Sequence, residues 1–148
     1  MLLKQSIFLS SIILALASFS GQTVEQRVKG CWVVQLGEWQ PKTVFDKDSI
    51  YVTPPAKIEL QDRYYYGVAG NRWNVLPANG AMPSVHHIVF FQSIGTDSIA
   101  IVWSTGYSGL SMRLAISQDT LRGTATTFWD FDRPQQTANV LLIRIECH

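Results

Sequence analysis

Short apolar runs separated by turn residues make up most of this chain. Hydrophobic and polar positions alternate along these runs, which are rich in Val, Ile, Thr, Tyr, Phe and Trp. Gly, Pro, Asn and Asp lie between the runs and no helical period appears, a pattern typical of all-β proteins. The pattern predicts strands at 31–36, 56–65, 71–77, 85–92, 98–105, 110–117, 120–131 and 138–147.

The connections between these runs favour an antiparallel arrangement. Most are short enough for hairpins, and only 37–55 and 78–84 are longer. Consecutive antiparallel strands predict an eight-stranded up-and-down barrel, with a β-sandwich as the main alternative. Antiparallel closure needs an even number of strands, so the barrel requires that residues 56–66 form one strand rather than two.

The first 21 residues have the pattern of a secretory signal peptide. Lys4 precedes an apolar run from Ile7 to Phe19 that only serines interrupt, and small residues follow. A membrane anchor is the alternative, but a span needs about 20 apolar residues. We therefore expect a signal peptide at 1–21 and one exported domain at 22–148, periplasmic or secreted and without a stable membrane span.

The charge balance argues against polyanionic partners. The sequence has twelve Lys and Arg, including Lys4, and eleven Asp and Glu, so loss of Lys4 leaves no net formal charge. No basic run occurs in the sequence, and phosphate binding needs clustered cations. We expect a monomer that binds no nucleic acid.

Two cysteines, Cys31 and Cys147, lie near the two ends of the predicted domain. In an exported protein two cysteines usually pair, and the alternative is two free buried thiols. A disulfide would place the first and last strands side by side. This is the arrangement that a closed barrel requires.

Gly30, Trp32 and Arg144 resemble a structural motif of lipocalins and related calycin barrels. Gly30-Cys31-Trp32 fits the G-x-W pattern that opens the first strand in that family. The resemblance implies that Trp32 packs across the closed end of the barrel under Arg144. By alternation Trp32 points away from Cys31, and Arg144 away from Cys147, so the two pairs lie on opposite faces of the sheet.

The chain is also similar to a group of small exported bacterial proteins of unknown function. That group shares a G-C-W start, a V-L-P segment, a W-S-T-G-x-S-G turn, a T-T-F-W-D-F strand end and a terminal cysteine. The matching segments here are 30–32, 75–77, 103–109, 126–131 and Cys147. This resemblance implies a fold class and no particular activity.

Aromatic residues gather at one end of the predicted barrel. Hairpin topology sends the connections 37–55 and 78–84, and the turns at 106–109 and 132–136, to the end opposite the cysteines, which we call the mouth. Trp39 is expected to fold over the mouth as a lid. The other residues that we place there are Trp73, His86, Trp103, Tyr107, Trp129, Asp130 and Phe131.

The partner of Asp130 and the inward face of its strand concern the same region. Arg113 and Arg72 are candidates to pair with Asp130 and to anchor a ligand. In the strand that contains TTFWDF, either Trp129 or Asp130 faces the interior, because neighbouring residues point to opposite faces. The apolar series Leu121, Ala125, Trp129 favours an inward Trp129.

These indoles indicate that the mouth binds a small hydrophobic or amphipathic ligand. The alternative is a packed structural or interaction module of the cell envelope, because an eight-stranded barrel can fill its own interior. A cavity lined by Trp73, Trp103 and Trp129 would favour the binding of a small ligand. A barrel filled by its own side chains would favour the packed module. The last strand, VLLIRI, is apolar on both faces, which indicates either a covering segment or a surface that meets a partner.

The sequence contains no complete catalytic or metal-binding set, so we expect no enzymatic activity and no cofactor. His86 and His87 are adjacent on a strand and point to opposite faces, so they do not readily share an ion. The GYSG segment at 106–109 precedes an alternating strand rather than the helix of a nucleophile elbow. Asp130 and Asp132 lie beside a turn, where carboxylates are commonly solvated or form the turn.

Overall fold

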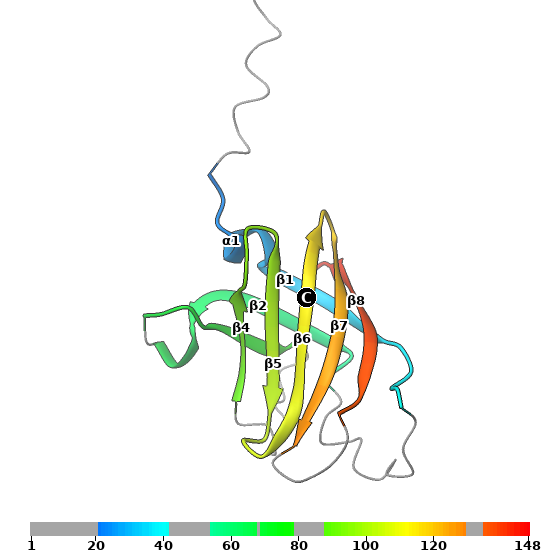
Figure 1. Ribbon diagram of the computed structural model, residues 1–148. Helices are drawn as coiled ribbons and strands as arrows, with labels where there is room; N and C mark the ends of the chain where they lie inside the picture. The colour runs from blue at the N-terminus through cyan, green and yellow to red at the C-terminus, as the bar shows by residue number, and fades with distance from the viewer. Residues whose placement is uncertain (1–20, 42–53, 68, 79–87, 130–134) are drawn as a thin grey trace, which may run out of the picture.

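The computed structural model describes residues 21–41, 54–67, 69–78, 88–129 and 135–148. Eight antiparallel strands form a closed barrel in which strands adjacent in sequence pair and β1 pairs with β8 (Figure 1). The elements are α1 (Val24–Val28), β1 (Gly30–Leu36), β2 (Lys57–Tyr64), η2 (Tyr65–Gly67), β3 (Trp73–Pro77), β4 (Ile88–Ser93), β5 (Ser98–Ser104), β6 (Ser108–Ser117), β7 (Thr120–Trp129) and β8 (Thr137–Ile145). The up-and-down barrel is confirmed, and the sandwich is excluded.

The predicted strands correspond to the observed ones with small differences at their ends. Residues 57–64 form one strand that is followed by the short η2 turn, so the strand count that closure requires is met. Residues 85–87 and 130–131, which we expected to be in strands, lie outside the described residues, as do the first 20 residues of the predicted signal peptide.

Helix α1 was not predicted. Its five residues are too few to show a helical period, but its N-terminus carries a capping box. The Thr23 hydroxyl accepts a hydrogen bond from the Gln26 N–H at 3.3 Å, and the Gln26 side chain accepts one from the Thr23 N–H at 3.0 Å. These bonds satisfy backbone N–H groups that a short helix otherwise leaves without partners.

Side chains that face the barrel interior alternate with outward ones along the strands, as the sequence pattern predicts. Cross-strand neighbours continue the inward row around the barrel, for example from Trp32 to Ile58 and from Val89 to Trp103. The largest fully buried side chains are those of Trp32, Trp103, Phe91, Ile58, Leu60, Ile99, Ile101, Leu110, Met112, Leu114, Leu121 and Leu142. Each contributes about 1.5–3 kcal/mol through removal of apolar surface from water.

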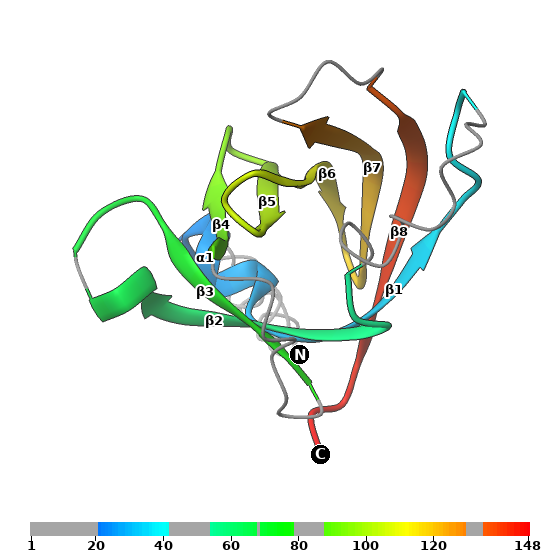
Figure 2. The same cartoon turned by 90° about the horizontal axis from the view of Figure 1, so that it is seen from below.

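The two ends of the barrel differ. Helix α1 lies at one end, which we call the α1 end, beside the start of β1 and the β4–β5 turn (Figure 1). Figure 2 views the barrel from the opposite end, the mouth end, with α1 behind the strands. The strand ends at the mouth end are Leu36, Lys57, Pro77, Ile88, Ser104, Ser108, Trp129 and Thr137.

Candidate functional site

The α1 end is closed by side chains that bind the last carbonyl groups of the helix segment. The indole Nε1 of Trp32 donates to the Val28 carbonyl at 2.9 Å. The Arg144 guanidinium donates to the carbonyls of Arg27 and Lys29, at 2.6 and 2.7 Å. Three successive carbonyls, which a helix C-terminus cannot satisfy internally, therefore bond to residues of β1 and β8.

The contact that the lipocalin resemblance implies is present at this end. The Arg144 guanidinium carbon lies 4.3 Å from the centre of a Trp32 ring, a cation–π geometry. Gly30 has φ of 134°, and a Cβ there would lie 2.9 Å from Arg144 Nη1. Glycine is therefore required at this position, both for its backbone conformation and for the space that the guanidinium occupies.

The predicted disulfide is confirmed. Cys31 and Cys147 are bonded, with Cα atoms 5.3 Å apart and a sequence separation of 116. The bond ties the start of β1 to the segment that follows β8. A structural disulfide is typical of proteins in oxidising compartments outside the cytoplasm. Among the described residues, no helix has the length and apolar character needed to cross a membrane.

Three of the predicted mouth indoles, those of Trp39, Trp103 and Trp129, converge at the mouth end. Trp103 is fully buried in the interior. It is in register with Leu110, which is in register with Thr127. Trp129 is two residues after Thr127 in β7, so its side chain faces the same, inward side and lies nearer to the rim. Trp129 is half-buried. The inward orientation of Trp129 agrees with the prediction from Leu121 and Ala125.

Trp39 is held by an extension of the sheet rather than by an independent lid. Gln40 exchanges two backbone hydrogen bonds of 2.8 Å with Thr137, the first residue of β8. The Gly37 N–H donates to the Asn139 carbonyl at 2.8 Å. Trp39, between these anchors, is half-buried and packs against the hydrophobic core. It thus belongs to the wall of the mouth.

Two hydroxyl groups of the described mouth are engaged within the protein. The hydroxyl of Thr127, which faces inward and is fully buried, accepts a hydrogen bond from the Gln136 N–H at 2.8 Å. The Ser104 hydroxyl accepts from the Gly106 N–H at 2.9 Å and donates to the Ser108 carbonyl at 3.1 Å. These described groups therefore serve the fold, and aromatic side chains are the main inward surface.

The GYSG segment is a hairpin turn, as the sequence indicates. The Thr105 N–H donates to the Ser108 carbonyl at 2.9 Å, and Gly106 has φ of 97°. Tyr107 lies at the tip of this β5–β6 turn at the mouth end, with 70% of its surface exposed. It therefore points into solvent at the rim.

The prediction that Trp73 belongs to the mouth is wrong. Trp73 is the first residue of β3, which begins at the α1 end, and it pairs with Phe91 and Tyr64. Its ring stacks on that of Tyr64 with centroids 4.6 Å apart. Strand direction explains the difference, because Trp73 follows the turn from β2 at the α1 end, whereas the mouth receives the other end of β3.

Trp73 also lies beside Glu25 of α1. Burial alone would raise the pKa of Glu25, but hydrogen bonding from its own backbone N–H and from Ser93, Thr23 and Trp73 outweighs that effect and lowers the pKa below its ordinary value of 4.5. The Trp73 indole Nε1 has no partner in full hydrogen-bond geometry within the described chain. Trp73 is accordingly the smallest of the contributions that lower the Glu25 pKa.

The prediction that Arg113 serves the mouth is also wrong. Arg113 is exposed on the outer face of β6, between the inward-facing Met112 and Leu114. Arg72 lies over the ring of Phe90, 4.5 Å from its centre. His86 and Asp130, together with His87, Phe131 and Asp132, lie outside the described residues.

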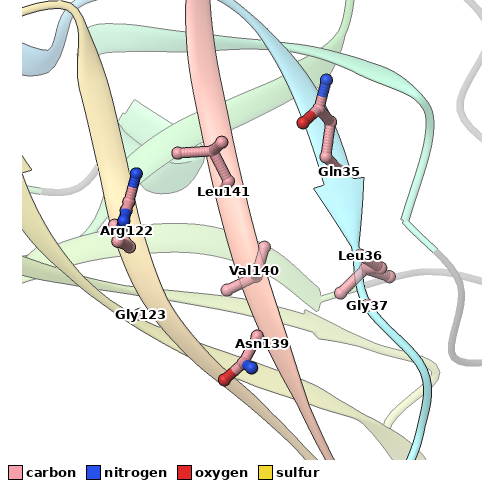
Figure 3. A pocket seen from close by; sticks show the side chains of 8 residues that line it. All are labelled: Gln35, Leu36, Gly37, Arg122, Gly123, Asn139, Val140 and Leu141. Atoms are coloured by element: carbon pink, nitrogen blue, oxygen red, sulfur yellow. The ribbon is translucent and has the colours of Figure 1, made fainter.

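Sequence reasoning did not identify a groove on the outer face of β7, β8 and β1 (Figure 3). Its main lining side chains are those of Gln35, Arg122, Asn139 and Leu141. The relevant signal was the alternation along each strand, which places these residues outward. Their proximity, however, depends on the register of three strands, which the sequence does not reveal.

Within the described ranges, no group of three or more His, Cys, Asp or Glu residues is placed to hold a metal ion. No protein-family model matches the chain, and neither a curated protein nor a solved structure is significantly similar to it. The architecture, a closed antiparallel barrel of eight sequential strands, is consistent with a lipocalin-like fold.

Proposed function

We propose that this protein is an exported, lipocalin-like barrel that binds a small hydrophobic or amphipathic molecule at its mouth end, in the periplasm or outside the cell. Binding, rather than catalysis, is the proposed activity. The observation that carries the proposal is the convergence of Trp39, Trp103 and Trp129 at the mouth end, where Trp39 and Trp129 are only half-buried.

The incomplete burial of Trp129 is informative because of its orientation. Trp103, the last inward residue of β5 before the mouth, is fully buried. Trp129, one inward position further out, is only half-buried. Apolar surface of this kind, directed toward the barrel axis, supports contact with an apolar ligand.

The asymmetry of the barrel also supports binding at this end. The α1 end is occupied by the helix and by the bonds that Trp32 and Arg144 make to it. Access for a ligand is therefore proposed from the mouth end. The engaged hydroxyls of Ser104 and Thr127 leave aromatic surface as the main described recognition element, which favours an apolar ligand body.

Fluorescence titration tests the proposal. Protein produced for export from the full chain is titrated with the amphipathic dye 1-anilinonaphthalene-8-sulfonate and with a series of fatty alcohols that compete for it. We expect saturable dye emission that the alcohols displace. We also expect that Trp129→Ala or Trp39→Ala weakens dye binding at least tenfold, because each removes a large aromatic contact.

Trp73→Phe is the matched control, because it alters an indole at the α1 end and should leave dye affinity unchanged. Circular dichroism establishes that each variant is folded. The proposal fails if no ligand saturates the wild-type protein, or if the Trp73 variant loses as much affinity as the two mouth variants.

A second candidate function is a packed module of the cell envelope that binds no small ligand. The extent of the buried core supports it, because large side chains fill the interior from Trp32 at the α1 end to Trp103 near the mouth. The same titration separates the two candidates. A folded wild-type protein that binds neither dye nor alcohol supports the packed module.

A further inference from the structure

The outer face of the barrel carries a groove that the proposed mouth site does not use. It has a volume of about 620 Å³ and crosses β7, β8 and β1 (Figure 3). Pockets for small ligands commonly measure about 300–1,000 Å³. Because the barrel is closed, no strand edge is free at this surface, so a ligand there would be recognised by side chains rather than by strand addition.

The groove arises from the register of three strands. Gln35 pairs with Leu141, and Leu141 pairs with Arg122, so their side chains form one row across the outer face. In the next row Asn139 projects from β8, and Gly37, whose N–H is bonded to the Asn139 carbonyl, has no side chain. The missing side chain leaves the groove open beside the Asn139 amide.

The polar side chains of the groove favour an anion. Arg122 is exposed, and the described structure gives its guanidinium no carboxylate partner. Gln35, beside Leu141 on β1, and Asn139, two residues before Leu141 on β8, supply amide N–H donors (Figure 3). A guanidinium binds a carboxylate through two parallel hydrogen bonds, and one such cation matches one monoanionic group.

The floor of the groove and its continuation along β8 are apolar. Leu141 is half-buried on the outer face, and Ile143, the next outward residue of β8, is 36% exposed. Ile143 is in register with the half-buried Val33 of β1. An apolar strip thus begins beside Arg122 and leads away from it. The surface therefore offers a cation for a charged group and, next to it, apolar side chains for a hydrocarbon chain.

We propose that this groove binds a small amphipathic carboxylate, with its carboxylate on Arg122 and its apolar body along Leu141 and Ile143. Asn139, on the strand next to Arg122, donates a further hydrogen bond, and Gln35 lines the far side of the groove. The site is independent of the mouth, since it lies on the opposite side of the barrel wall. A small ligand is the proposed occupant, because one unpaired cation beside one short apolar strip matches a single carboxylate with one apolar chain.

Nuclear magnetic resonance titration tests this proposal with octanoate as the probe. Isotope-labelled protein, produced for export from the full chain, is titrated with octanoate and separately with octanamide, which has the same chain but no charge. We expect octanoate to shift the amide signals of 35–37, 122–123 and 139–141. Octanamide should bind at least tenfold more weakly, because it lacks the charge that pairs with the guanidinium.

The variant pair Arg122→Gln and Arg113→Gln provides the decisive comparison. Both remove one exposed outward arginine from neighbouring strands, but only Arg122 lines the groove. Arg122→Gln should weaken octanoate binding at least tenfold, and Arg113→Gln should leave it unchanged. Equal losses in both variants would overturn the proposal, because they would indicate attraction to diffuse surface charge.

Two further outcomes would also overturn the proposal that the groove binds a carboxylate. Equal affinity for octanoate and octanamide would remove the role of the carboxylate. Shifts confined to Trp39 and Trp129 would assign the probe to the mouth and would support the proposed function instead. Trp129→Ala keeps the two proposals separate, because groove binding should survive a substitution that weakens binding at the mouth.

Discussion

Replacement of Arg144 by methionine should destabilise the protein by about 3–4 kcal/mol. Methionine keeps an unbranched side chain but removes both hydrogen bonds to the α1 segment and the contact with the Trp32 ring. Because 28% of the Arg144 side chain is exposed, the group is only partly desolvated. Its interactions therefore have to be weighed one by one.

The bond to the Arg27 carbonyl is partly buried and involves a charged donor, so its loss costs about 2 kcal/mol. The Lys29 carbonyl is exposed, so water replaces the lost bond and the cost is about 0.5 kcal/mol. The cation–π contact with Trp32 contributes about 1 kcal/mol. Asp119, which lies 3.3 Å from the guanidinium and is 82% exposed, contributes about 0.5 kcal/mol or less.

Urea denaturation followed by circular dichroism measures this change. For a slope of about 2 kcal/mol per molar urea, the midpoint should fall by nearly 2 M. Arg144→Lys should recover only part of the loss, because an ammonium group cannot hold two carbonyls and cover the ring in one geometry. Asp119→Ala serves as the control and should shift the midpoint by about 0.3 M or less.

A loss below 1 kcal/mol in Arg144→Met would contradict this account of the α1 end. Equal losses in Arg144→Met and Asp119→Ala would contradict it too, because the ion pair would then be the main interaction. If lysine restored full stability, the charge alone would suffice, and the hydrogen bonds and ring contact would not matter.

Three further predictions follow from the described structure. Loss of the Cys31–Cys147 disulfide through a double serine substitution should cost about 4–5 kcal/mol by the chain-entropy model, because the sequence separation of the two positions is 116, and a calorimetric comparison of melting measures this. Gly123→Ala should cost about 3 kcal/mol in urea denaturation, because a Cβ there collides with the backbone of β6, and a change below 1 kcal/mol would refute this. Because the pKa of Glu25 is lowered in the folded protein, its stabilising contribution is complete above about pH 4.5 and is lost as the pH falls through the lowered value. Glu25→Gln should therefore make the free energy of unfolding depend less on pH at the acid end of a stability–pH profile. An unchanged acid dependence in this variant would contradict the prediction.

The alternation of apolar residues was sufficient to predict the barrel. In β5 and β6 the inward residues, Ile99 and Ile101 on one strand and Met112 and Leu114 on the other, stand at every second position, and all are buried. The two cysteines then made closure of the sheet a testable requirement, which the β1–β8 pairing and the disulfide meet. The alternation of apolar residues and the disulfide both constrain the whole sheet, and the overall fold could therefore be predicted from them.

The site was less accessible to sequence reasoning for two physical reasons. Trp73 was assigned to the wrong end because position within a strand determines the end, and Trp73 is the first residue of β3. Arg113 was expected near the mouth although alternation already placed it opposite Met112 and Leu114. A local pattern gives the face of a strand, whereas proximity between strands depends on register.

Helix α1 makes the two ends of the barrel different, whereas the strands alone would leave them similar. An up-and-down barrel of hairpins has two similar ends, and either could admit a ligand. Here Trp32 and Arg144 bond three carbonyls at the end of α1, and the fully buried Val28 packs beneath. Release of the helix from this end would break all of these contacts, at a cost of several kcal/mol, so the open state would be populated well below 1%. The same G-x-W segment that begins the first strand thus closes one end, and this is why we propose ligand entry at the other end, where the half-buried indoles lie.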